Sequence, residues 1–76
     1  MNPLFVRAEW DDAAGVWVAT SGDVPGLATE SETLEALIAT LKAMIPDLPA
    51  ANGQDTVNDV PFDLLTRRFE MAPAHA

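Results

Sequence analysis

Cysteine and tyrosine do not occur in this 76-residue chain, and histidine occurs once, as His75. Without cysteine the protein has no disulfide bond, no thiolate nucleophile and no cysteine-ligated metal site, which suits a reducing compartment. A general base must be held within hydrogen-bonding reach of its target, and a histidine in an unanchored tail has no such support. Ser-His-Asp chemistry is therefore disfavoured.

Long apolar runs are also missing, because no stretch approaches the roughly 20 apolar residues needed to cross a bilayer. The first residues, MNPLFVRAEWDD, lack the basic segment and following apolar stretch of a secretory signal. We therefore expect a cytoplasmic protein that does not bind membranes.

Basic residues are scarce: four Lys and Arg stand against twelve Asp and Glu, for a formal net charge of −8. Nucleic-acid binding relies on basic side chains that neutralise phosphates, so we expect no direct binding of DNA or RNA. Two interpretations of the acidity stay open. It keeps a small domain soluble, or it forms a face complementary to a basic partner.

Carboxylates are numerous enough to raise the question of a two-metal nuclease site, which needs several acids at one point. Asp11 and Asp12 fall in one predicted turn and Asp23 in another loop, at the opposite end of a predicted strand. A strand rises about 3.3 Å per residue, so Asp11 and Asp23 are too far apart to share a metal ion. We expect no catalysis, no metal and no cofactor.

Residues 3–21 have the pattern of a β-hairpin. In LFVRAEW the apolar residues at even positions, Trp10 included, alternate with Phe5, Arg7 and Glu9 and are expected to face the core. DDAAG, residues 11–15, has turn chemistry, and VWVAT is rich in β-branched and aromatic residues. The prediction is two strands joined by a five-residue loop.

The second strand raises the question of where Trp17 points. We expect Val16 and Val18 to face the helix, which leaves Trp17 and Ala19 on the other face of the sheet. There Trp17, with Phe5, would form an apolar patch that is either covered by a partner or exposed. This patch, the small size of the domain and the unpaired backbone of an outermost strand predict a symmetric homodimer.

A turn and a helix start follow in GDVPGLATES. Pro25 fixes its own φ and Gly26 suits the corner of a type II turn, after which residues 27–29 are expected to form a short third strand. The helix is expected to begin near Ser31, with either Ser31 or Thr29 as its N-cap.

Seven apolar side chains then recur at the spacing of one buried helical stripe, which Pro46 is expected to end. They are Leu34, Leu37, Ile38, Leu41, Met44, Ile45 and Leu48. Residues 50–59 are polar and predict a mobile segment. Residues 60–71 are interpreted as a final strand, with a short helix as the alternative, and residues 72–76 as a disordered tail.

These elements predict one α+β domain over residues 1–71, in the order β-β-β-α-β, with one helix packed on a mostly antiparallel sheet. A right-handed crossover from the helix would place the last strand parallel to the first.

The order and spacing of several motifs resemble the N-terminal domain of HicB-type antitoxins over about residues 5–45. GVWVA is similar to the G-x-W/Y-x-A strand of that family, DVPG to its D-x-P-G loop and ATESETLEA to its helix start. The ending VPFDLLTRRFE is similar to that of a short HicB-related subgroup. The matching residues are Gly15, Trp17, Ala19, Asp23, Pro25, Gly26, Ala28, Thr33, Leu34, Glu35 and Ala36.

The resemblance implies a partial ribonuclease-H-like fold, with three antiparallel strands, the last strand beside the first, and none of that enzyme's catalytic carboxylates. It implies a protein that binds and masks a small basic ribonuclease toxin, HicA, and that self-associates. Full HicB antitoxins also carry a C-terminal DNA-binding segment, for which this chain has no residues, so operator binding is not expected.

Two functions from different classes follow. One is an antitoxin-like inhibitor of a small basic ribonuclease, and the other is a stand-alone homodimeric domain with an adaptor or structural role. The candidate contact residues, for a partner or a second copy, are Phe5, Trp17, Asp23, Val24, Pro25 and Gly26.

Overall fold

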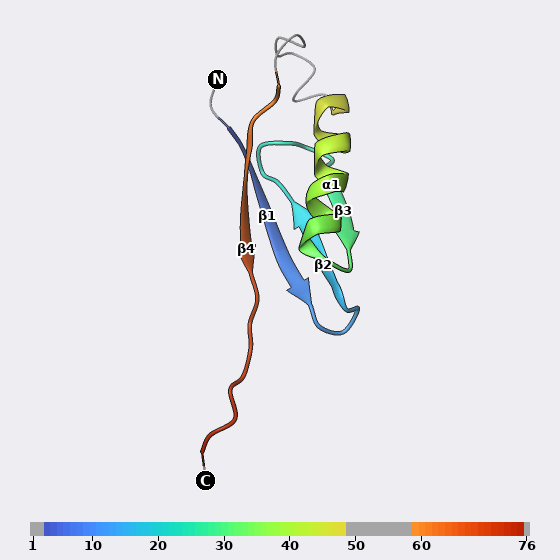
Figure 1. Cartoon of the computed structure of the whole chain (residues 1–76). Helices are drawn as coiled ribbons and strands as arrows, with labels where there is room; N and C mark the ends of the chain where they lie inside the picture. Colours follow the sequence, from blue (N-terminus) through green and yellow to red (C-terminus); the bar gives the residue numbers. More distant parts are fainter. Residues whose placement is uncertain (1–2, 49–58, 76) are drawn as a thin grey trace.

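The computed structural model describes residues 3–48 and 59–75 and shows one helix packed on one face of a four-stranded sheet (Figure 1). The predicted α+β class and the order β-β-β-α-β are confirmed. The elements are β1 (Leu4–Asp11), β2 (Val16–Thr20), β3 (Ala28–Ser31), α1 (Leu34–Met44), the 3₁₀ helix η1 (Ile45–Asp47) and β4 (Phe62–Arg67). The predicted mobile segment lies outside the described residues, apart from Asp59.

The strands lie in the order β3-β2-β1-β4. The β1–β2 and β2–β3 pairs are antiparallel, whereas β4 lies parallel to β1, as the crossover from the helix predicts. Residues 60–71 therefore supply a strand and not a helix, although it ends at Arg67. β3 and β4 are the two edge strands of the sheet.

The β1–β2 connection is one residue shorter than predicted. Asp11 pairs with Val16 as part of β1, so four residues and not five join the strands. Gly15 has φ +68° and donates its N–H to the Asp11 carbonyl oxygen over 2.7 Å. A left-handed conformation at this point suits glycine, which has no Cβ to clash.

The helix begins later than predicted, and its N-cap is Thr33, not Ser31 or Thr29. Thr33 has extended backbone angles, and its Oγ1 accepts a hydrogen bond from the Ala36 N–H over 3.1 Å. β3 continues to Ser31, past the predicted end at Thr29, and so uses both expected caps as strand residues. At its other end α1 stops at Met44, and Pro46 lies in η1, as expected.

Thr33→Ala is expected to lower the free energy of unfolding by about 1 kcal/mol, because the Ala36 N–H loses its acceptor. Urea unfolding followed by circular dichroism measures this change. Ser31→Ala removes a hydroxyl two residues earlier and is expected to have a smaller effect. A larger loss for Ser31→Ala would contradict the assignment of the cap.

The core lies between the sheet and α1. Its buried residues are Val6, Ala8, Trp17, Ala19, Val24, Leu27, Leu37, Leu41 and Ile45. Three members of the predicted helical stripe, Leu37, Leu41 and Ile45, are fully buried, as their spacing indicates. No buried side-chain N or O atom among the described residues lacks a hydrogen-bond partner.

The face predicted for Trp17 was wrong: its side chain is 9% exposed and belongs to the core. The register of the hairpin explains the error. Trp17 pairs with Trp10 and Ala19 with Ala8, and cross-strand partners lie on the same face of a sheet. Because Trp10 and Ala8 face the helix, Trp17 and Ala19 must as well, which leaves Val16 and Val18 on the other face.

None of the helices in the described ranges is long and apolar enough to cross a membrane.

Candidate protein-binding surfaces

The sheet face without the helix, here called the open face, carries two exposed apolar side chains. Phe5 on β1 is 39% exposed, and Leu65 on β4 is 53% exposed. Strand alternation and register add charged neighbours on the same two strands: Arg7, Glu9, Asp63 and Arg67. We call these six residues the β1–β4 patch. β2 contributes the half-buried Val16 and Val18 to the same face.

Apolar side chains continue past β4 in a segment that leaves the body of the protein, residues 68–75, here called the C-terminal arm (Figure 1). Phe69 is 71% exposed and Met71 is 78% exposed. With Phe5 and Leu65 they complete the set of exposed large hydrophobic residues in the described ranges. The radius of gyration, 14.8 Å, exceeds the about 11 Å expected of a compact chain of this length.

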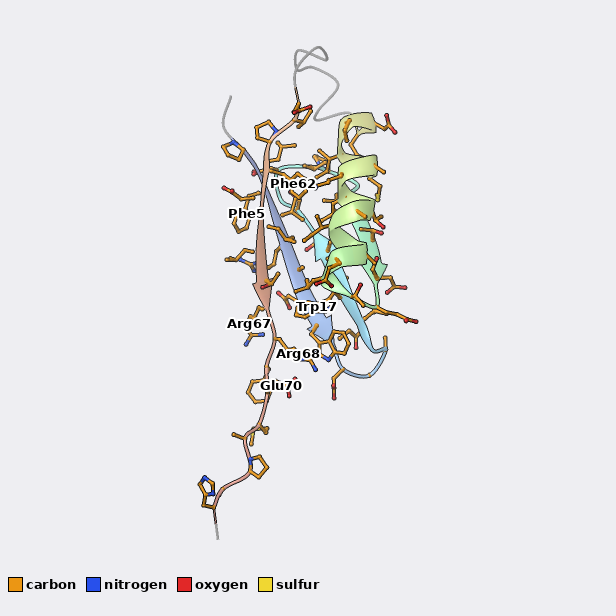
Figure 2. All side chains as sticks on the ribbon, in the orientation of Figure 1. Phe5, Trp17, Phe62, Arg67, Arg68 and Glu70 are labelled. Atoms are coloured by element: carbon orange, nitrogen blue, oxygen red, sulfur yellow. The ribbon has the colours of Figure 1, made fainter. Side chains whose placement is uncertain are left out.

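A cation–aromatic cluster fixes the start of the arm. The Arg68 guanidinium lies 4.3 Å from the centre of the Trp10 ring and 6.0 Å from that of Trp17, and it forms an ion pair with Glu70 (Figure 2). The two indoles meet edge to face with centroids 5.4 Å apart, and Trp10 Nε1 donates to Asp12 Oδ1 over 3.2 Å. Sequence reasoning missed this cluster. Phe62 packs against the core, so strand alternation from Phe62 to residue 68 would have placed Arg68 on the helix side.

The loop after β2 fastens the beginning of β1. Phe5 N–H donates to Asp23 Oδ2 over 2.9 Å, and the Ser21 hydroxyl donates to the Phe5 carbonyl oxygen. Ser21 Oγ also accepts from the N–H groups of Asp23 and Val24, over 3.1 and 3.2 Å. Gly26 turns the chain with φ +87°. The SGDVPG sequence therefore serves a structural purpose, because the side chains of Ser21 and Asp23 complete the hydrogen bonding of β1 where β2 has ended.

The predicted contact residues lie in three different environments. Phe5 is on the open face, whereas Trp17 and Val24 are in the core. Pro25 and Gly26 are exposed in the turn, and the exposed Asp23 is already bonded to Phe5. The structure thus brings Asp23 to Phe5 and separates Trp17 from both.

Charge is distributed unevenly between the two sides of the sheet. From residue 8 to residue 41 the sequence has no Lys or Arg, although it has seven Asp and Glu. This span supplies the second half of β1, all of β2 and β3 and most of α1, and the exposed Glu30, Glu32 and Glu35 gather where β3 leads into α1. We call these three residues the acidic edge. Three of the four cations, Arg7, Arg67 and Arg68, lie on β1, on β4 and directly after it.

No group of three or more carboxylate or imidazole side chains in residues 3–48 and 59–75 is arranged to hold a metal ion. What the described residues offer is surface: an acidic edge beside β3, and an apolar patch with charges of both signs beside β4. Surfaces of both kinds occur at contacts between proteins.

The chain matches the model of a family described as a domain of unknown function, DUF1902, over residues 3–73. Among solved structures it is similar to a hypothetical protein from the extremely thermophilic bacterium Thermus thermophilus, with 42% sequence identity and a TM-score of 0.66. That match covers 96% of this chain and 100% of the other. No curated protein matches the chain. With nearly its whole length matched, this chain belongs to the DUF1902 family.

Proposed function

We propose that this protein is a non-enzymatic protein-binding domain, similar to a HicB antitoxin, that binds and masks a small basic ribonuclease of the HicA type through its acidic edge. The observation that carries the proposal is the concentration of Glu30, Glu32 and Glu35 at an edge of the sheet in a span without any Lys or Arg. A uniformly acidic surface attracts a basic protein and speeds its association.

The backbone of β3 adds a second means of binding. As an end strand of the sheet, β3 pairs with β2 on one side, and no strand of the described residues pairs with its other side. Edge strands present N–H and C=O groups that an incoming strand can pair with. A basic partner that adds a strand there would meet the glutamates at the same time.

The proposal predicts that the purified chain suppresses RNA cleavage by a small basic HicA-type ribonuclease encoded beside its gene. Suppression is expected at equimolar amounts, because the partner is masked by binding and not by turnover. Cleavage of a labelled RNA measures inhibition, and calorimetry without RNA measures affinity. Glu30→Lys with Glu32→Lys is expected to weaken binding at least tenfold, about 1.4 kcal/mol.

The matched control is Asp47→Lys with Asp59→Lys, which changes the net charge equally at two exposed positions away from the acidic edge. This control is expected to bind almost as tightly as the native chain at physiological salt, where exposed charges farther apart than about 8 Å are screened. Equal losses of affinity in both variants would show that binding depends on net charge alone. They would reject the acidic edge as the binding site. Absence of inhibition by the native chain would reject the antitoxin-like function and favour a stand-alone domain.

A further inference from the structure

We propose that a second copy of this chain covers the β1–β4 patch, with the C-terminal arm of each copy against its partner. This inference does not depend on the proposed function, because the patch includes the edge strand β4, whereas the acidic edge lies at β3, the opposite edge of the sheet.

The apolar side chains of this region have no cover within the described chain. Phe5 and Leu65 lie on neighbouring strands, where Phe5 pairs with Asp63 and Arg7 with Leu65, so they are diagonal neighbours on one face. Phe69 and Met71 follow β4 in the C-terminal arm and are more exposed still. A soluble monomer seldom presents its exposed large hydrophobic residues together, and such a concentration marks an interaction surface.

The charges of the patch distinguish a second copy from a basic partner. Arg7 and Arg67 would repel a basic protein, and they are half of all the cations in the sequence. Glu9 and Asp63 balance these two arginines, so the six residues of the patch carry no net charge, although Asp11 follows on the same face of β1 and the chain as a whole carries −8. Two copies of so acidic a chain repel each other least where their surfaces are neutral. Opposite charges in the same patch also allow each copy to offer an arginine to a carboxylate of the other.

These charges remain available for contacts between copies. Arg67 lies beside Glu9 in the register of β1 and β4, but the two do not form an ion pair. The ion pair found among the described residues joins Arg68 and Glu70. In a two-fold dimer the same patch meets itself, so a residue of one copy contacts a different residue of the other, and that contact occurs twice. An arginine and a carboxylate on each copy therefore give at least two ion pairs across the interface.

The patch and the arm together form an extended surface (Figure 1). A stable interface buries about 800 Å² per partner, roughly one seventh of the 5419 Å² that this chain exposes. The patch spans two strands, the arm extends beyond the body (Figure 1), and Phe69 and Met71 lie in that arm. The monomer is 58 Å long but only 22 × 19 Å across, and Phe69 and Met71 in the arm stay mostly exposed, so a second copy would supply the cover they lack.

The first test is the mass of the native chain by sedimentation equilibrium at about 50 µM, a concentration at which modest interfaces associate. A dimer of the 8.1 kDa chain is expected. Leu65→Ser and Arg67→Glu are each expected to weaken the dimer at least tenfold. Lys42→Glu makes the same charge change as Arg67→Glu at an exposed position on α1 and is expected to leave the dimer intact.

A charge exchange tests whether the partner is a second copy on this patch. Arg7→Glu with Arg67→Glu makes the patch wholly acidic, and Glu9→Lys with Asp63→Lys makes it wholly basic. Each variant alone is expected to be monomeric, and an equimolar mixture is expected to form a heterodimer. All four positions are exposed, so circular dichroism is expected to show the native fold in both variants.

A monomeric native chain at about 50 µM would overturn the proposal and leave the patch to a different partner. A dimer that Leu65→Ser and Arg67→Glu leave unchanged would place the interface elsewhere and overturn it as well. So would a mixture of the acidic and basic variants that stays monomeric. None of these measurements contains a ribonuclease, so their outcome is independent of the proposed function.

Discussion

Trp17→Ala is expected to lower the free energy of unfolding by about 3–5 kcal/mol, the usual range for removing a buried aromatic side chain. Trp17 is one of the largest side chains in the core and packs edge to face on Trp10. The Arg68 guanidinium lies 6.0 Å from the centre of its ring. Domains of this length are stable by only about 0.05–0.15 kcal/mol per residue. For 76 residues that is about 4–11 kcal/mol, so a loss of this size removes from about a quarter to all of the stability.

Urea unfolding of dilute protein, followed by far-ultraviolet circular dichroism, measures this effect without a contribution from association. Val18→Ala is the matched control, because Val18 follows Trp17 on the same strand but is half-buried on the open face. Its loss is expected to be well under half that of Trp17→Ala. A folded Trp17→Ala variant that merely fails to dimerise would show instead that Trp17 points away from the helix.

Leu41→Ala is expected to lower the free energy of unfolding by about 2–5 kcal/mol. Leu41 is fully buried near the end of α1, where it packs between Leu37 and Ile45 against the sheet. Two costs add up: the transfer free energy of the removed side chain, and the cost of the cavity left behind. The cavity persists because the close-packed sheet cannot move far enough to fill it.

Lys42→Ala is the control for Leu41→Ala, because it changes the next residue of the same helix at an exposed position. Surface substitutions of this kind stay within about 0.5 kcal/mol. Chemical unfolding of the two variants side by side measures the difference. Similar losses for both would mean that the helix, and not its contact with the sheet, limits stability.

Periodicity predicted the architecture from sequence because most elements have only one apolar set. Leu37, Leu41 and Ile45 can share a face only in a helix, and the alternation of β1 admits one buried set. Gly15 and Pro46 mark element ends for steric reasons that do not depend on tertiary context. The order of the elements then limits where β4 can lie.

Periodicity could not predict which face of β2 is buried, because both of its faces are apolar. Val16 and Val18 suit a core as well as Trp17 and Ala19 do, so alternation alone cannot choose between them. The hairpin register decides, and one residue in the length of the turn reverses the whole strand. The cap of α1 was ambiguous for a similar reason: Thr29, Ser31 and Thr33 can all accept a backbone hydrogen bond, and the extent of β3 selects the last of them.

The candidate surfaces were partly predictable. Acidity and the exposure of Phe5 follow from composition and alternation. The segregation of charge could not be predicted from composition, because it depends on β4 lying beside β1 and bringing Arg67 close to Arg7. The arm was interpreted as a frayed tail from residue 72, yet the chain leaves the body earlier, and the contact of Arg68 with Trp10 sets its starting direction.

The parallel pairing of β1 with β4 has a consequence for the time course of folding. Leu4 pairs with Phe62 and donates its N–H to the Pro61 carbonyl oxygen over 3.0 Å, so this ladder joins nearly opposite ends of the chain. The hairpin and β3 form from near neighbours in sequence, whereas β4 must wait for a long loop to close. β4 is therefore expected to dock last and to open first, and its amide protons to exchange with deuterium before those that join β1 to β2.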